Sequence, residues 1–313
     1  MSRSAILPLL TLASACASAP GTASIFLEAE DTITSGVPAG STGEAIQDGW
    51  SVTFDEYAVA IGDVRVRDAL DPDVRREASE RFAVDLRSVP ETGVSLWTFD
   101  DLDPGRWEIG YAIGGITLVR RDPVSDAAFA ALGPDAAYFI RGTLTRADGR
   151  SCPPSTLATP GAATPSGDPN AGGDPCYDNP SITFELALPS AISFGPCEVD
   201  GLGGFAVTSS AETSVAITIH GDHLFFNGFP EGSEGGVMRF AQWLADCDLD
   251  LDGEVTRAEL EAINPSDLPE IDSRFQLGGT PLTPLDSMWT YLTAQGMTQG
   301  HFQGEGECAL RSF

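Results

Sequence analysis

The feature that most constrains the fold of this chain is a set of short segments in which apolar and polar residues alternate. The stretch from Trp50 to Ile61 follows this period of two, and so does the stretch from Trp107 to Ile113. A period of two places alternate side chains on one face of a strand. Four further short runs are rich in Val, Ile, Thr and Phe, and turns rich in Gly, Pro and Asp separate them; they lie at residues 138–149, 181–188, 204–209 and 214–221. This pattern predicts an antiparallel β-sandwich over residues 46–229.

The pattern changes at two places along the chain. Residues 150–180 are rich in Pro, Gly and Ser, which predicts a disordered-like loop within the sandwich domain. After residue 230, an apolar stripe at helical spacing runs from Val237 to Ala245, and a helical pattern resumes at residues 257–263. A third helical pattern begins at Thr283 as N-cap. The sequence therefore predicts a mainly β protein with a helical C-terminal module at residues 230–313.

The N-terminus reads as an export signal. A positive residue, a short apolar run and small residues follow one another in residues 1–15. Cys16 comes directly after them and makes the segment resemble a bacterial lipoprotein signal, in which Cys16 is lipidated. Ordinary signal cleavage, with Cys16 left as a plain thiol, is the alternative. Residues 16–45 are small and polar, which predicts a flexible tether.

Export permits disulfides. Beyond Cys16 the chain has five cysteines, so one of them stays free or pairs between chains. Cys152 and Cys176 bracket the Pro- and Gly-rich loop, and we predict that they join its ends. Cys247 falls at the end of a predicted helix, where a buried thiol is common. This leaves Cys197 to pair with Cys308.

The stretch DLDLDGEVTRAE, residues 248–259, has the spacing of a calcium-binding loop. Calcium prefers six to eight hard oxygen ligands, and alternate carboxylates on a tight loop supply them. Gly253 permits the sharp bend, and Val255 is the apolar residue that packs the loop inward. The predicted ligands are Asp248, Asp250, Asp252, Glu254 through its backbone carbonyl, Thr256 and Glu259.

This stretch resembles the loop of the EF-hand family at every constrained position. The resemblance implies a helix-loop-helix and a Ca²⁺ ion, with one further helix after it. The sequence shows a single such loop, whereas EF-hands that act as sensors usually come in pairs. A structural role for calcium is therefore favoured, and pairing through a dimer stays open.

The chain has three histidines: His220, His223 and His301. Histidine is a common ligand of transition metals, and Asp222, Glu305 and Glu307 offer carboxylates nearby in the sequence. Residues i and i+3 of a regular strand face apart, so a shared site requires a turn between His220 and His223. Two interpretations stay open: a three-histidine site for Zn²⁺ or copper, or histidines that form hydrogen bonds between the two predicted domains.

Charge and motifs limit the function. A formal net charge of −29 argues against nucleic acid or anionic membrane surfaces as partners. No phosphate-binding loop or nucleophile elbow occurs, which favours a non-catalytic protein. A β-rich domain before an EF-hand loop resembles uncharacterised lipoproteins of myxobacterium-like bacteria, which implies export but no activity. The sequence predicts an exported calcium-binding protein, located at the outer membrane or cell surface through a lipid anchor, or else periplasmic or secreted. The alternatives are a zinc- or copper-binding protein and a carbohydrate-binding module that uses the aromatic residues Trp50, Trp97, Trp107 and Tyr111.

Overall fold

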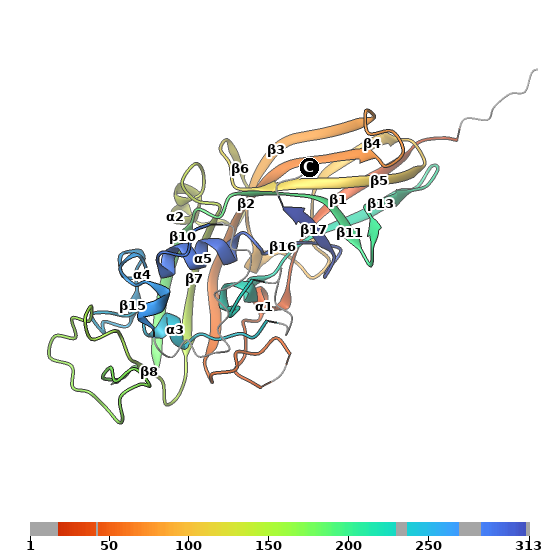
Figure 1. The fold of residues 1–313 in the computed structure, drawn as a ribbon. Helices are drawn as coiled ribbons and strands as arrows, with labels where there is room; N and C mark the ends of the chain where they lie inside the picture. The colour runs from red at the N-terminus through yellow and green to blue at the C-terminus, as the bar shows by residue number, and fades with distance from the viewer. Residues whose placement is uncertain (1–17, 42, 230–236, 269–282, 311–313) are drawn as a thin grey trace, which may run out of the picture.

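The computed structural model describes residues 18–41, 43–229, 237–268 and 283–310, and its regular structure is mainly β (Figure 1). The smaller of the two main sheets has the strand order β16-β14-β1-β4. These strands are β1 (Gly21–Ala29), β4 (Val94–Leu102), β14 (Glu212–Ile219) and β16 (Gly300–Phe302). The predicted mainly β fold is confirmed. The sheets are mixed rather than purely antiparallel, because β1 pairs with β14 in parallel.

The larger sheet follows the order β12-β11-β5-β2-β7-β10-β15, and four more strands attach beside this path. The strands on the path are β2 (Ser51–Asp68), β5 (Gly105–Ile113), β7 (Tyr138–Thr145), β10 (Ser181–Leu188), β11 (Ile192–Val199), β12 (Leu202–Gly203) and β15 (Glu254–Val255). The attached strands are β3 (Arg75–Asp85), β6 (Leu118–Arg120), β13 (Phe205–Val207) and β17 (Glu307–Leu310). A separate small sheet pairs β8 (Arg150–Ser151) with β9 (Tyr177–Asp178).

The long strand β2 connects the two ends of the larger sheet. Its first half, Ser51–Val59, pairs with β7, whereas its second half pairs with β3 and β5. The alternation predicted from Trp50 onward corresponds to this strand, and Val52, Phe54 and Tyr57 are all buried. The period of two therefore identified the central strand correctly.

The helices are short. They are α1 (Asp31–Thr34), α2 (Asp126–Ala131), α3 (Gln242–Ala245), α4 (Arg257–Ala262) and α5 (Met288–Gly296), with 3-10 turns η1 (Leu86–Ser88), η2 (Gly221–Phe225) and η3 (Pro265–Asp267). Figure 1 shows α3, α4 and α5 beside β7 and β10, on one side of the larger sheet.

The predicted flexible tether over residues 16–45 is wrong for its central part. Residues 21–29 form β1, which lies between β14 and β4 inside the smaller sheet. Ala23, Ile25 and Leu27 are completely buried. A central strand covered on both sides does not need polar residues at alternate positions, so the periodicity that identifies half-buried strands is weak here.

The C-terminal part is less helical than predicted. The stripe from Val237 to Ala245 forms only the four-residue helix α3, and the helix predicted after the loop is the six-residue α4. The helix predicted from Thr283 begins at Met288, with Ser287 rather than Thr283 as its N-cap. Three strands also lie in this region: β16 belongs to the smaller sheet, and β15 and β17 belong to the larger one. Residues before and after position 230 also share one hydrophobic cluster.

Both predicted disulfides are present: Cys152 bonds to Cys176, and Cys197 bonds to Cys308. Cys247 is a free buried thiol, as predicted. Disulfides are typical of proteins that mature outside a reducing cytoplasm. No helix in the described part of the chain is long and apolar enough to cross a membrane. The predicted signal peptide and Cys16 lie outside the described residues.

The segment 150–180 has little regular structure, yet it is not a free loop. Besides the disulfide, the Thr159 amide donates to the Leu249 carbonyl at 2.7 Å, and the Cys152 amide donates to Asp246 Oδ1 at 2.7 Å. These bonds hold the segment against the predicted calcium loop. Its composition excluded helices and long strands but gave no sign of these contacts.

Candidate metal centres

A tight turn brings His220 and His223 to the same side of the chain. His220 ends the extended segment of β14, and its amide donates to the Gln299 carbonyl at 3.0 Å. The 3-10 turn η2 then reverses the chain. A Cβ on Gly221 would lie 2.5 Å from Ile33 Cγ1, so this turn requires glycine. The turn removes the difficulty that residues i and i+3 of a strand face apart.

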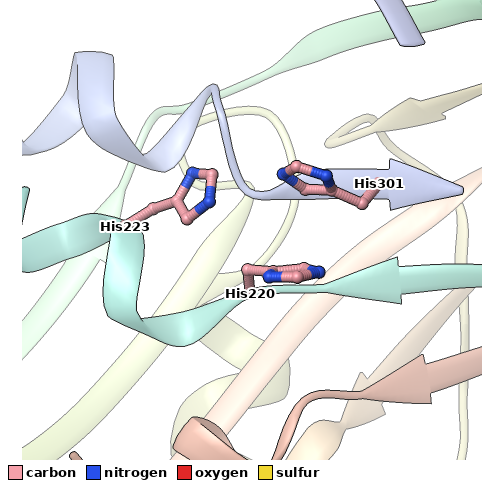
Figure 2. A group of neighbouring side chains, drawn as sticks. All are labelled: His220, His223 and His301. Carbon is pink, nitrogen blue, oxygen red and sulfur yellow. The ribbon is translucent and has the colours of Figure 1, made fainter. Parts of the chain in front are cut away.

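His301 reaches the same place from β16. This strand pairs with β14, and His301 lies opposite Thr218. The centroid of the His301 ring is 4.2 Å from that of His220 and 5.1 Å from that of His223, while the rings of His220 and His223 are 5.6 Å apart. Figure 2 shows the three imidazoles grouped between these two strands and the turn. One ring nitrogen from each histidine lies within 4.8 Å of the other two.

Hydrogen bonds fix the tautomer of His223. The hydroxyl of Thr298 donates to the Gln295 carbonyl at 2.8 Å, and the same oxygen lies 2.9 Å from His223 Nδ1. A hydroxyl has one hydrogen, so Nδ1 must be the donor in the second bond. The lone pair of His223 therefore lies on Nε2.

His220 lies between an acidic side chain and a backbone carbonyl. Its Nε2 is 3.2 Å from the Gly304 carbonyl oxygen, which can only accept, so Nε2 carries a hydrogen. Its Nδ1 is 3.3 Å from Glu30 Oε1. Burial alone would lower the pKa of His220, but the hydrogen bond and charge of Glu30, with the charges of Glu305 and Asp222, outweigh burial and raise that pKa.

The other two histidines are held neutral. Burial lowers the pKa of His301 to about 3, and the neighbouring His223 and His220 add to this effect. Burial also lowers the pKa of His223 well below its usual value, with help from His220 and Arg239. Neutral imidazole is the form that binds a metal.

Two buried polar atoms of this cluster lack a hydrogen-bond partner. They are Nδ1 of His301 and Oδ1 of Asp222, whose other oxygen forms an ion pair with Arg239. Buried polar atoms are almost always paired, so each of these needs an explanation.

The rings line a cavity of about 270 Å³. Among the described residues that line it, five are carboxylates and Arg239 is the one lysine or arginine; the acidic residues are Glu30, Glu44, Asp222, Glu305 and Glu307. The structure thus brings the three predicted histidines and the three predicted carboxylates together. Glu30 and Glu44 were missed, because they are more than 170 residues away along the sequence and show no motif.

The second centre is the predicted calcium loop. Oxygens of Asp248, Asp250 and Glu259 lie within 4.8 Å of one another, and Gly253 has a positive φ of 84° at the sharp bend. Val255 is completely buried, as predicted for the residue that packs the loop inward. The side chains of Asp252 and Glu254 are exposed, and Thr256 caps α4. The predicted ligand of Glu254 is its backbone carbonyl, which does not depend on where its side chain points.

Asp248 is the buried ligand candidate of this loop. One of its oxygens accepts from Asn179 at 2.8 Å and from the Gly253 amide at 3.0 Å. The other, Oδ1, is buried without a hydrogen-bond partner. Burial raises the pKa of Asp248 to about 6, and the charges of Glu259 and Asp252 add to this effect.

Glu259 has two roles in the loop. Its Oε1 accepts from the Leu249 amide at 2.8 Å, and its Oε2 accepts from the amide and the hydroxyl of Thr256, both at 2.8 Å. The side chain therefore closes the loop and completes a capping box at the start of α4.

In the described part of the chain, the strand of the predicted calcium loop pairs with the larger sheet and not with a second loop of this kind. Residues Glu254–Val255 form β15, which pairs in parallel with Thr183 and Phe184 of β10. This edge of the larger sheet takes the place that a partner loop would occupy in a paired arrangement.

The aromatic residues considered for carbohydrate binding do not form a surface platform. Trp50, Trp97, Trp107 and Tyr111 are all at most 4% exposed. They pack in the main hydrophobic cluster, so these four side chains cannot present a face to a sugar.

No protein-family model, curated protein or solved structure matches this chain. The functional argument therefore depends on the residues of the two centres and on their geometry.

Proposed function

We propose that this protein is an exported, non-catalytic calcium-binding protein, with one EF-hand-type site at residues 248–259. The observation that carries the proposal is Asp248 Oδ1, a buried carboxylate oxygen without a hydrogen-bond partner beside the carboxylates of Asp250 and Glu259. A divalent cation bound by these oxygens would satisfy the orphan atom and relieve the repulsion among the carboxylates.

The donor set favours calcium over a transition metal. All of the candidate ligands are oxygens, from carboxylates, a hydroxyl and a backbone carbonyl, and such ligands suit hard cations. Binding by Asp252, Glu254 and Thr256 requires the exposed side of the loop to close around the ion. Glu259 would then exchange part of its capping hydrogen bonds for calcium.

The contacts of the loop support a structural role. Asn179 connects Asp248 to the segment beside β9, Leu249 accepts from Thr159, and β15 extends the larger sheet. A calcium ion in the loop would therefore fix the disulfide-bonded segment 152–176, the helix α4 and β10 relative to one another.

Calcium should stabilise the folded protein measurably. With a dissociation constant of ~10–100 μM and calcium at ~1 mM, binding adds about 1.4–2.7 kcal/mol to the free energy of unfolding. The measurement is urea unfolding of chelator-treated protein with calcium and with the same concentration of magnesium. Stabilisation by calcium but not magnesium is expected, whereas equal unfolding curves would contradict a calcium site.

The same proposal places the protein outside the cytoplasm, anchored through a lipid on Cys16. The two disulfides support export. Mass spectrometry of the N-terminal peptide from native cells decides the anchor: an acylated Cys16 supports it, and a free N-terminus at another residue contradicts it.

A further inference from the structure

We propose that His220, His223 and His301 form a second metal site, which binds a divalent transition metal of the zinc and copper(II) class. This inference does not depend on the calcium site, because the two centres share no residue. Its basis is the convergence of the only three histidines of the chain in one cavity.

The hydrogen bonds already prepare the rings for a metal. The lone pair of His223 lies on Nε2 because Thr298 accepts from Nδ1. His220 donates from Nε2 to Gly304, which leaves Nδ1, on the side of Glu30, as its ligand atom. Outer hydrogen bonds of this kind fix the tautomer and orientation of metal-binding histidines.

Glu30 is a candidate fourth ligand through its contact with His220. At zinc bond lengths of about 2.0–2.2 Å and a tetrahedral angle, two ligand atoms are separated by about 3.3–3.5 Å. The separation of His220 Nδ1 and Glu30 Oε1 is 3.3 Å. The metal would replace the proton that these two atoms share. Glu30 converges with His220 and Asp222, whereas the ligand nitrogens of His223 and His301 converge with one of His220, all within 4.8 Å of one another. Binding one ion by all three rings therefore requires the nitrogens to approach one another by up to about 1.5 Å.

A purely structural role for these histidines explains less. Such a role would pair each buried polar atom, yet His301 Nδ1 and Asp222 Oδ1 have no hydrogen-bond partner. The rings of His223 and His301 are also neutral, buried and in contact with one another. A metal ion beside them supplies the missing partner for a nitrogen lone pair.

The surroundings favour a cation and give it access. Five carboxylates and one arginine line the cavity, so its formal charge is strongly negative before the histidines are counted. Imidazole nitrogen suits zinc and copper, whereas calcium prefers oxygen. The two centres should therefore select different ions from a mixture.

The test is a zinc titration of the full chain, stripped by chelator, with both disulfides intact and no histidine tag. A chromophoric chelator competes for the zinc. One Zn²⁺ per chain is expected in the unmodified protein. The zinc affinity of the His223→Ala/His301→Ala variant should fall by more than ~10–100-fold, which is the loss that a change outside the ligand shell causes. Glu259→Gln is the matched control, since it should weaken calcium binding strongly and leave zinc affinity unchanged. Zinc binding that is absent in the unmodified protein, or unchanged in the double variant, would overturn the proposal.

A second measurement does not depend on variants that fold. Because the chain has three histidines and all of them line the site, its imidazole NMR signals report only on this cavity. One equivalent of Zn²⁺ should shift all three sets of ring signals. Shifts confined to one ring, or none, would contradict the three-histidine site while leaving the calcium proposal untouched.

Discussion

Replacing Glu259 with glutamine should weaken calcium binding by more than about 100-fold, beyond the range that is usual for residues outside the ligand shell. The amide keeps one acceptor oxygen but loses the charge and the second oxygen that would close the site. Isothermal titration of chelator-treated protein measures this affinity directly. The substitution also weakens the capping box of α4, so the free energy of unfolding should fall by about 1 kcal/mol even without calcium.

Glu261→Gln is the matched control for this prediction. Glu261 lies two residues later on the exposed side of α4, where it pairs with Arg257 and does not face the loop. Its replacement should change calcium affinity by less than about twofold relative to the unmodified protein, since an exposed ion pair of this kind contributes little to stability. Equal losses in both variants would indicate a general effect of charge rather than a site closed by Glu259.

Replacing Cys197 and Cys308 together with serine should lower the free energy of unfolding by about 4–5 kcal/mol. This bond spans 111 residues of sequence and holds β17 against β11. Long loops lose the most unfolded-state freedom when they are closed, so the corresponding change at Cys152 and Cys176, which are 24 residues apart, should cost about 3–4 kcal/mol. Urea unfolding of the two double variants gives the comparison. A smaller loss at Cys197 and Cys308 than at Cys152 and Cys176 would contradict this order.

The fold could be predicted where one face of a strand is buried. The alternation from Trp50 onward identified β2, and similar patterns identified β5, β7, β10 and β14. The strand β1 was missed because it is covered on both sides, with a burial pattern that does not alternate. The strands β16 and β17 were missed because three or four residues are too few to show a period.

The candidate sites differ in how far the sequence could define them. All of the calcium-loop residues lie within twelve positions, so spacing alone predicted the convergence of Asp248, Asp250 and Glu259. The histidine cluster needed the pairing of β14 with β16, which joins residues about 80 positions apart. Glu30, the acidic neighbour of this cluster, is even farther away along the sequence, and no local pattern connects it with His220.

The contacts of β15 give a reason why the proposed calcium site would not need a second loop. In a paired arrangement each loop strand supports the other, whereas β15 is supported by β10. Asn179 and the segment 152–176 add hydrogen bonds to the same loop. These contacts are consistent with an ion that stabilises the structure rather than one that switches it.

The most direct test of the central claim is a crystal structure of the protein grown with ~1 mM calcium, with anomalous diffraction used to locate the ion. We expect one calcium peak about 2.3–2.6 Å from oxygens of Asp248, Asp250 and Glu259. Asp252 should turn from solvent toward the same peak. A loop without an anomalous peak, in crystals that contain calcium at that concentration, would contradict the account.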